Sequence, residues 1–499
     1  MLAKLRDGII KFAQKNKTSP TICAIASGMF PLAFYYYRNF TLINSWSQFL
    51  FFIFYFLLIP ILVFEVINFM FNRIKIFKSL KKYLLTFLNL SWCVYLLVFI
   101  TIGFNWLNTI IAIFTVVTVT LILYKYLNKA IVFQLILACV IFIYFTDYLI
   151  RVPKNPSNWL EQPDEIEKVI LKNKPNIYFI QPDGYANSTE ISKGYYNYDN
   201  SEFENFLIEN NFKIYSDYRS NYYSTLSSNS SLFAMKHHYY NKPSSRITEL
   251  FNARDVIVGA NPVLTILKNN NYSTNLLLDT SYLLKNRPNI AYDYCNFNYE
   301  DLSYFSKGLQ SNRDVFLDLK ERMKLTKNGS NFYFIEKLCP THITTAKNPR
   351  NIADLERDKY LKRLEESNIW LKKLLTYIHN NDDNSIVIIA SDHGGFVGFN
   401  SMIESRTKQT NRDLIYSIFT AQLAIKWPDG YELSYDNKIK TPVNLFRVLF
   451  SILSENEIYL NHLQEDKSFI QINDKAPVGV YEYINRAGEV VFEEYKEDM

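Results

Sequence analysis

The chain has 499 residues, of which 48% are hydrophobic, and a formal net charge of +6 at neutral pH. This length allows about two or three domains. The charge is small for the size, and no block of lysine and arginine is dense enough for a nucleic-acid groove, so nucleic acid is excluded as a partner. Cys295 and Cys339 lack C-x-x-C spacing, which argues against a thiolate metal site. A disulfide between these two cysteines is possible but unsupported.

Long apolar runs fill the first third of the chain and predict a membrane domain over residues 1–150. Each run approaches or exceeds the roughly 20 residues that a helix needs to cross a bilayer. A cleavable signal peptide is the alternative for the first run, but four more runs follow and no small-residue cleavage site stands out. We therefore expect five transmembrane helices at about 19–37, 47–71, 83–103, 106–124 and 130–150.

Cationic residues gather in alternate segments between these runs. The amino-terminal tail carries five, the segment 72–82 carries five and the loop 125–129 carries two, whereas the other loops hold only Arg38. By the positive-inside rule the amino terminus is cytoplasmic and residue 151 onward is outside. The pattern predicts a multi-pass protein of the cytoplasmic (inner) membrane with an extracytoplasmic domain. A transporter is disfavoured, because most spans lack acidic residues and histidine.

The rest of the chain reads as a juxtamembrane linker, residues 151–174, followed by a domain over residues 175–499. Strands alternate with helices in this domain, which predicts an α/β fold with a largely parallel sheet. A C-terminal β-hairpin is expected to turn at 485–488. The expected helices are 201–210, 230–240, 261–268, 313–324, 351–380 and 442–454, and the expected strands include 212–215, 273–279, 330–337 and 415–427.

Two further apolar runs, 176–185 and 385–395, are predicted strands that end in polar groups. The first ends in Asp183 and a glycine, and the second in Asp392, His393 and two glycines. In open α/β sheets the reactive crevice lies beyond the carboxyl ends of the strands. We therefore expect the three side chains to lie in this crevice; for the second run alone, a polar turn without a function is the alternative.

A hydroxyl-rich stretch, residues 220–231, contains Thr225 and leads into a helical pattern. It is predicted to be a loop whose last hydroxyl groups cap a helix. A nucleophilic hydroxyl at a helix amino terminus is favoured by the helix dipole and the free N–H groups. Alternatively, the serines only cap the helix and Thr225 has no role.

Taken together and in this order, residues 176–185, 221–240 and 391–394 resemble the alkaline phosphatase/sulfatase superfamily. The likeness is to the membrane branch that includes lipoteichoic acid synthases and lipid A phosphoethanolamine transferases, with five spans and an outer catalytic domain. The segment 441–447 is also similar to one found in sulfatase-like members. The resemblance implies an alkaline-phosphatase-like α/β/α sandwich.

The same resemblance implies a site. Asp183, Thr225, Asp392 and His393 would surround one divalent metal, manganese or zinc, and Thr225 would be the nucleophile. Lipid-modifying relatives commonly have glutamate at the position of Asp183, whereas sulfatases and phosphodiesterases have aspartate, which leaves the sub-branch open. His342 resembles a histidine that contacts the substrate phosphate or leaving oxygen, although an extra threonine precedes it and the following proline is absent. A surface or hydrogen-bonded histidine is the alternative.

The implied chemistry is attack of Thr225 on a phosphorus atom, with departure of the donor alcohol, protonated by His342, and a phosphothreonine intermediate. An acceptor hydroxyl or water then attacks the same phosphorus. Membrane tethering concentrates lipid headgroups near the domain, which favours a membrane lipid donor and a saccharide or glycolipid acceptor. We therefore expect transfer of a phosphoglycerol or phosphoethanolamine-type group. The alternatives are an extracytoplasmic phosphoester or sulfate-ester hydrolase, and a non-catalytic sulfatase-like membrane protein.

Overall fold

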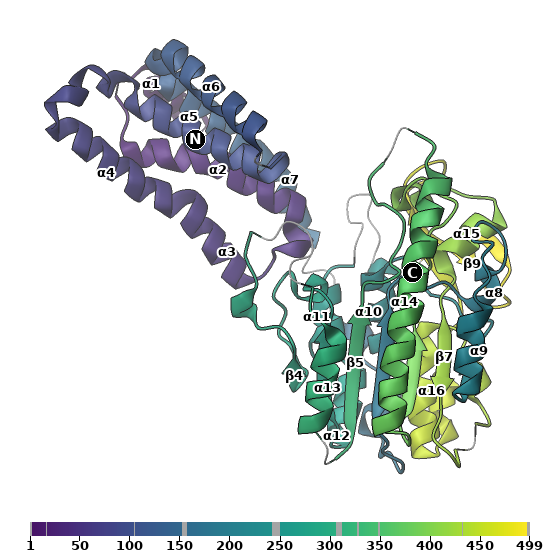
Figure 1. The fold of residues 1–499 in the computed structure, drawn as a ribbon. Coiled ribbons are helices and arrows are strands. Elements are labelled where there is room, and N and C mark those ends of the chain that lie inside the picture. The colour runs from purple at the N-terminus through teal and green to yellow at the C-terminus, as the bar shows by residue number, and fades with distance from the viewer. Residues whose placement is uncertain are drawn as a thin grey trace. The chain divides into compact units, whose positions relative to one another are not determined.

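The computed structural model describes residues 2–15, 17–103, 105–151, 157–241, 250–305, 312–326, 329–347, 350–431 and 433–496. The chain divides into two compact units, residues 1–154 and 155–499. The first unit is helical, and the second is built around a large β-sheet (Figure 1).

The helices of the first unit include one long element with a local change of pitch. Its two α-helical parts, α3 and α4, are joined by a π-helical turn, η2, so that helix runs without a break from Trp46 to Arg73. The helices are α1 (Leu2–Gln14), α2 (Pro20–Asn39), α3 (Trp46–Ile53), η2 (Phe54–Leu58), α4 (Ile59–Arg73), α5 (Lys81–Thr101), α6 (Trp106–Leu123), η4 (Tyr124–Tyr126) and α7 (Leu127–Arg151).

Helix α2 packs against α4, α5 and α7. Gly28 permits a close approach of α2 to the π-helical turn η2, because a Cβ atom there would lie 2.0 Å from the Phe56 carbonyl oxygen. Side-chain amides also join the helices: Asn89 on α5 donates to the Cys23 carbonyl at 2.9 Å and exchanges two hydrogen bonds with Gln134 on α7. Small residues and amide pairs of this kind are typical of helices that associate in an apolar solvent.

Among the described residues, three helical stretches are long and apolar enough to cross a membrane: Trp46–Arg73, Lys81–Thr101 and Trp106–Thr146. The last has 41 residues, about twice the length needed for one span. The predicted first span, 19–37, forms α2 but is not one of the three, because prolines and a run of tyrosines lower its apolar character. Large apolar side chains point outward from these helices, with Phe114 72% and Ile143 70% exposed.

The larger unit contains a seven-stranded mixed sheet in the order β2-β7-β6-β1-β5-β3-β4. Five strands from β6 to β4 run parallel to one another, whereas β7 pairs antiparallel with both β6 and β2. The largely parallel sheet expected from the sequence is therefore present. The strands are β1 (Ile177–Pro182), β2 (Phe212–Ile214), β3 (Ser273–Leu278), β4 (Tyr294–Cys295), β5 (Asn331–Lys337), β6 (Ile386–Ala390) and β7 (Leu423–Lys426).

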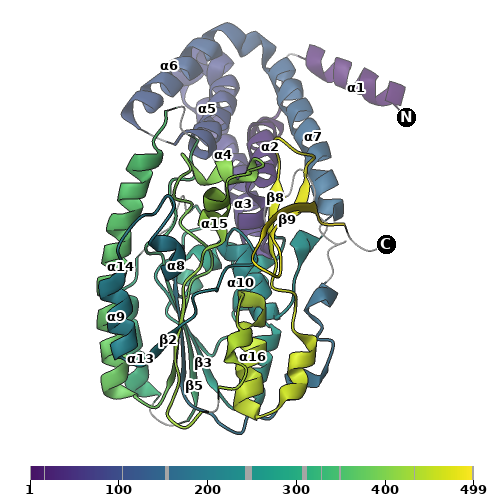
Figure 2. The same cartoon turned by 90° about the vertical axis from the view of Figure 1, so that its right-hand side faces the viewer.

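Helices cover both faces of this sheet, as Figure 2 shows, and each face has its own apolar core. One core is formed with α10 (Thr225–Ala234), α11 (Ala253–Val258), α12 (Pro262–Asn269) and α16 (Pro442–Ser454). The other is formed with α9 (Ser201–Glu209), α13 (Val315–Leu325), α14 (Ala353–Asn381) and α15 (Arg412–Phe419). Two short elements complete the helical part, α8 (Ser188–Ile191) and η11 (Met402–Arg406).

A second sheet of three antiparallel strands, β10-β9-β8, closes the chain. Its strands are β8 (Ser468–Ile472), β9 (Gly479–Ile484) and β10 (Val490–Glu494). Strand β8 reaches back to the start of α10, because the Asn221 carbonyl accepts a backbone hydrogen bond from Phe469 at 2.8 Å. The C-terminal strands are therefore attached to the segment that leads to Thr225.

Three predicted elements differ in the structure. The expected strand 415–427 is the helix α15 followed by the short β7, because Asn411 caps a helix by accepting from the Asp413 backbone at 2.8 Å. In place of the expected helix 230–240 the structure has α10, which begins earlier, at Thr225, and ends before Met235, whose backbone is left-handed with φ 52°. Part of the predicted linker 151–174 belongs to the domain, because Ile166 is fully buried in its core.

Candidate metal centre and cavity

Two neighbouring parallel strands place acidic residues at the same edge of the sheet. Asp183 follows the last residue of β1, and Asp392 lies two residues beyond the end of β6. The strands pair with Ile180 opposite Ile389, so both acids leave the sheet at the carboxyl end. Asp183, Asp392 and His393 are all buried, with at most 3% exposure. The structure thus brings together the three side chains that the sequence predicts there.

Glycines allow the chain to turn tightly beneath these side chains. Gly184 has φ +67°, and a Cβ atom there would lie 2.7 Å from the Thr341 carbonyl oxygen. Its N–H donates to Asp392 Oδ1 at 3.1 Å. A Cβ atom on Gly395 would lie 2.3 Å from the ring of Tyr360. Residues with side chains do not fit at these two positions, so the glycines are required by the geometry.

Thr225 is the first residue of α10 and is buried, like every residue of that helix. Its hydroxyl donates to Asp183 Oδ1 at 3.1 Å and lies 3.3 Å from His393 Nε2. The sequence pattern predicts this residue in a loop before the helix, but the helix begins five residues earlier than expected. It can do so because its serines bond to backbone carbonyls, as Ser230 does to Leu226 at 2.7 Å.

The donor atoms of Asp183, Asp392 and His393 lie within 4.8 Å of one another. His393 Nδ1 is 2.8 Å from the Gly394 carbonyl, which directs Nε2 toward the carboxylates, 3.4 Å from Asp392 Oδ2 and 3.7 Å from Asp183 Oδ1. Asp392 Oδ2 is buried and has no hydrogen-bond partner among the described residues. A cation would satisfy this atom, and two carboxylates, an imidazole and a hydroxyl suit zinc or manganese.

Burial and mutual charge set the protonation of the cluster. Burial and the neighbouring Asp183 raise the pKa of Asp392 to about 6, although the nearby His393 opposes this shift. Burial also acts on Asp183, but the neighbouring imidazoles of His393 and His342, together with hydrogen bonds from Thr341 and Thr225, outweigh it and hold its pKa below the usual value. Burial tends to lower the pKa of His393, yet Asp392 and Asp183 raise it overall. The cluster therefore favours a carboxylate on Asp183 and a positive charge beside it.

His342 lies at the wall of a cavity of about 450 Å³ that opens onto Thr225, Asp183 and His393. Its ring centroid is 5.9 Å from that of His393, and its Nδ1 is 2.6 Å from the Ile343 carbonyl. Burial lowers the pKa of His342, which favours the neutral ring. The structure thus places this histidine beside the cluster but outside the set of donor atoms that converge.

The sequence did not point to several other polar residues of this region. Lys285, Arg406 and Tyr223 line the same cavity and come from segments that are distant in the sequence. The guanidinium of Arg406 lies over the Tyr223 ring, 5.4 Å from its centroid. Glu336 on β5 is fully buried, and neither of its carboxylate oxygens has a hydrogen-bond partner in the described part of the chain. Single cationic residues, and one glutamate inside an apolar run, do not form a motif with a recognisable spacing, so the sequence alone does not identify them.

Two more histidines and two cysteines of this domain lie outside the converging donor atoms. His237 and His238 are buried, and their Nε2 atoms lie 2.8 Å from the Glu465 carbonyl and 2.9 Å from the Ser227 carbonyl. Both Cys295 and Cys339 are free thiols, so the structure contains no disulfide between them. They sit at different places, on the edge strand β4 and just after β5.

The fold and the cluster define the class as an α/β domain with a buried Asp-Asp-His centre beside a hydroxyl. No family model matches the chain, and no curated protein matches it. Known structures do resemble it. They include the periplasmic domain of EptC from Escherichia coli in complex with zinc, at 12% identity over 63% of this chain and 93% of that one, with a TM-score of 0.43.

Two further similar structures are an integral membrane transferase and a synthase. The lipooligosaccharide phosphoethanolamine transferase EptA from Neisseria meningitidis is 13% identical over 87% of this chain and 96% of that one, with a TM-score of 0.40. The lipoteichoic acid synthase LtaP from Listeria monocytogenes is 13% identical over 66% and 91%, with a TM-score of 0.41. Phosphoethanolamine transferases and lipoteichoic acid synthases are also the proteins that the sequence motifs resemble.

Proposed function

We propose that this protein is a membrane-bound, metal-dependent transferase that moves a phosphoryl headgroup from a phospholipid to a cell-envelope saccharide or glycolipid. The transferred group is of the phosphoglycerol or phosphoethanolamine type and is carried on Thr225. One observation supports this proposal above the others. The Thr225 hydroxyl lies at the amino terminus of a buried helix and donates to Asp183, within a cluster that includes His393.

We assign Asp183, Asp392, His393 and Thr225 as the residues that would hold a divalent cation. The orphaned Asp392 Oδ2 and the convergence of the other donor atoms support this assignment. When bound, zinc or manganese supplies positive charge for phosphoryl oxygens and lowers the pKa of a hydroxyl ligand. Thr225 is the reacting group, and the cavity of about 450 Å³ beside it gives room for a headgroup.

In the first half-reaction the Thr225 Oγ1 atom attacks phosphorus, and the bond between phosphorus and the donor alcohol breaks. The threonine proton passes to Asp183 Oδ1, to which the hydroxyl donates at 3.1 Å, and the departing oxygen of the donor takes up this proton and leaves as an alcohol. In the second half-reaction an acceptor hydroxyl attacks the phosphorus of the phosphothreonine, the bond between phosphorus and Thr225 Oγ1 breaks, and the threonine oxygen regains the proton that the acceptor loses. Burial favours the neutral form of His342, which can accept a proton but has none to give as an acid. We therefore assign His342 as the base that accepts the proton of the incoming hydroxyl, and not as the acid that protonates the first leaving group.

We further propose that the first unit crosses the membrane five times and that the larger unit is extracytoplasmic, with residues between them as the connection. The 41-residue stretch Trp106–Thr146 has the length of two spans, and α2 packs among the apolar helices as a fifth. The distribution of lysine and arginine in the loops supports a cytoplasmic amino terminus. Cysteine labelling at engineered loop positions in whole cells tests this topology.

The transfer is tested with the full chain purified in detergent and loaded with zinc or with manganese. The protein is incubated with phosphatidylglycerol or phosphatidylethanolamine carrying a labelled headgroup, and peptides are analysed by mass spectrometry. We expect a headgroup phosphate adduct on Thr225 that disappears in Thr225→Ala. An adduct on another residue, or none with either lipid and either metal, contradicts the proposal.

The fate of this adduct separates a transferase from a hydrolase. Addition of a glucosylated lipid or a glycan acceptor is expected to discharge the labelled threonine and to label the acceptor. Release of the free headgroup phosphate at the same rate with and without acceptor would instead identify a hydrolase. Ser231→Ala is the matched control for Thr225→Ala and should still form the adduct. This serine lies on the same buried helix, and its hydroxyl donates to the Ser228 carbonyl at 2.8 Å.

A further inference from the structure

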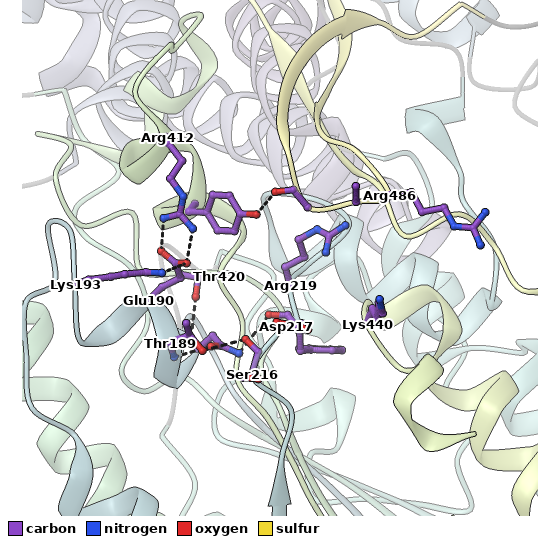
Figure 3. A pocket seen from close by; sticks show the side chains of 15 residues that line it. Thr189, Glu190, Lys193, Ser216, Asp217, Arg219, Arg412, Thr420, Lys440 and Arg486 are labelled. Carbon is purple, nitrogen blue, oxygen red and sulfur yellow. Dashed lines mark hydrogen bonds and ion pairs between the residues drawn. The ribbon is translucent and has the colours of Figure 1, made fainter. Parts of the chain in front are cut away.

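A second polar cavity, of about 300 Å³, lies at the end of the sheet formed by β2 and β7 (Figure 3). Five separate segments build it: the α8 region, the turn after β2, α15, the segment before α16 and the β9–β10 turn. It shares no lining residue with the cavity that contains Thr225. Neither the cluster nor the proposed transfer therefore accounts for its residues.

Positive charge dominates the lining of this cavity. Five cationic side chains against two carboxylates leave three positive charges in excess. Glu190 is the partner of two of the cations: it forms a two-pronged ion pair with Arg412, both distances 2.7 Å, and lies 3.2 Å from Lys193. The cations are Lys193, Arg219, Arg412, Lys440 and Arg486, and the acids are Glu190 and Asp217.

Arg219 is the unusual member, because it is only 5% exposed and forms no ion pair with any described carboxylate. One of its terminal nitrogens donates to two backbone carbonyls, those of Asp466 and Asn485. Its Nε atom is buried without a hydrogen-bond partner in the described part of the chain. A buried guanidinium without a paired counter-charge is destabilising, and an anion in the cavity would remove that cost.

The frame around Arg219 is held by the main chain. The Arg219 N–H donates to the Lys440 carbonyl at 3.1 Å, and Arg219 forms an antiparallel bridge with Thr420. On the opposite wall the Tyr416 hydroxyl donates to the Gly488 carbonyl and so attaches the β9–β10 turn to α15. In Figure 3 the guanidinium of Arg219 lies between Arg412 and Arg486. These contacts thus hold together the segments whose side chains line the cavity.

We propose that this cavity is a binding site for a phosphate-type oxyanion, either a small soluble phosphate compound or the phosphate of a lipid headgroup. Arginine presents a planar fork of donors that matches the oxygens of phosphate, and lysine adds a point charge. Thr189 and Ser216, also in the lining, offer hydroxyl groups for a polyol attached to the phosphate. The site is separate from the centre at Thr225 and does not rest on the proposed transfer.

The first experiment measures phosphate binding to the full chain in detergent by isothermal titration calorimetry. Thr225→Ala/Asp392→Asn is the background, with chelator present, so that the first cavity does not contribute. We expect inorganic phosphate to bind this background and to bind about tenfold or more weakly when Lys440→Gln and Arg486→Gln are added. Both of these lysine and arginine side chains are exposed, so the change should not impair folding.

A matched control replaces two exposed lysines outside the lining, Lys438→Gln and Lys475→Gln, and should change the affinity by less than about twofold. Arg219→Gln should abolish binding if it folds, as judged by its melting temperature. A short-chain phosphatidylglycerol in place of inorganic phosphate distinguishes the sources: binding of this lipid alone assigns a headgroup, and binding of phosphate assigns a soluble oxyanion. Binding of neither, or equal binding by the Lys440/Arg486 variant and the control, overturns the proposal.

Discussion

The two cavities belong to one sheet, yet their chemistry is opposite. At the centre, strands β1 and β6 deliver Asp183, Asp392 and His393 directly from their carboxyl ends. At the β2–β7 end, five loop and helix segments contribute an excess of cations around Arg219. The site at the strand ends is buried and has an excess of carboxylates, whereas the site built from loops and helices has an excess of cations. One fold can thus hold a site for a cation and a site for an anion.

Among the substitutions that separate the two cavities, replacement of Asp392 is expected to have the largest effect, a loss of metal affinity. Asp392→Asn keeps the size of the side chain but removes a charged donor atom, so the affinity for zinc or manganese should fall by at least about a hundredfold. Metal content after dialysis, measured by plasma mass spectrometry, gives the answer. Asp217→Asn in the cationic cavity is the control and should retain the metal. Equal metal content in the two variants would remove the distinction between the cavities.

Acid is expected to destabilise the structure next to the first cavity, whereas the cations of the second cavity keep their charge at low pH. Burial lowers the pKa of His237 to about 4 and that of His238 to about 3. Unfolded histidine titrates near 6.5, so between about pH 6.5 and 4 the unfolded chain binds more protons and stability falls as the pH falls. We expect a loss of about 2 to 3 kcal/mol for each histidine over this interval.

The melting temperature of the purified protein between pH 7 and pH 4 measures this effect. In His238→Gln the decline should be shallower than in the unchanged protein, because one neutral buried imidazole is removed. His462→Gln is the control, since this histidine is exposed and its replacement should leave the decline unaltered. Identical curves for the two variants would exclude His238 as a source of acid sensitivity.

Replacement of Glu336 tests whether the buried carboxyl groups near the first cavity destabilise the folded protein. Burial, together with Asp183 and Asp392, raises its pKa well above the usual value. Its stabilising contribution is therefore present below the unfolded pKa and is lost as pH rises through the folded one. Glu336→Gln should stabilise the protein more at pH 8 than at pH 5, because glutamine has the same size but cannot acquire the buried negative charge that burial, Asp183 and Asp392 disfavour.

Glu356→Gln is the matched control for this change and should act with the opposite sign. Glu356 is also buried, but it accepts from the Thr344 backbone and from Lys359, both at 2.8 Å. Burial opposes these contacts, yet they hold its pKa below the usual value. Thermal unfolding at pH 8 and at pH 5 compares the variants, and destabilisation by Glu336→Gln would show that its carboxylate has a stabilising partner.

The smallest effect is expected at the rim of the cationic cavity. Arg412 is 43% exposed and pairs with Glu190, so solvent screens most of their attraction. Arg412→Ala should change the free energy of unfolding by less than about 1 kcal/mol. A melting temperature far below that of the unchanged protein would mean that this ion pair contributes to the fold and is not only part of the lining.

The first cavity is predictable from the amino-acid sequence, whereas the second is not. Apolar strands that end in Asp183 and Asp392 obey a general rule of α/β sheets, so the pattern of residues alone predicts that these acids meet. The start of α10 is predicted too late, because its serines satisfy their hydroxyl groups within the helix. Arg219 carries no sequence signal, because its significance depends on burial without a paired carboxylate, which only the three-dimensional arrangement determines.

The complete burial of α10 has a kinetic consequence for the proposed transfer. A nucleophile on a helix enclosed by the core cannot swing between a donor and an acceptor, so both substrates must reach Thr225 through the same cavity at different times. The reaction would then follow a ping-pong scheme, in which the departing diacylglycerol must leave before the acceptor enters. Diacylglycerol should accordingly compete with the acceptor, and turnover should slow as this by-product accumulates in the membrane.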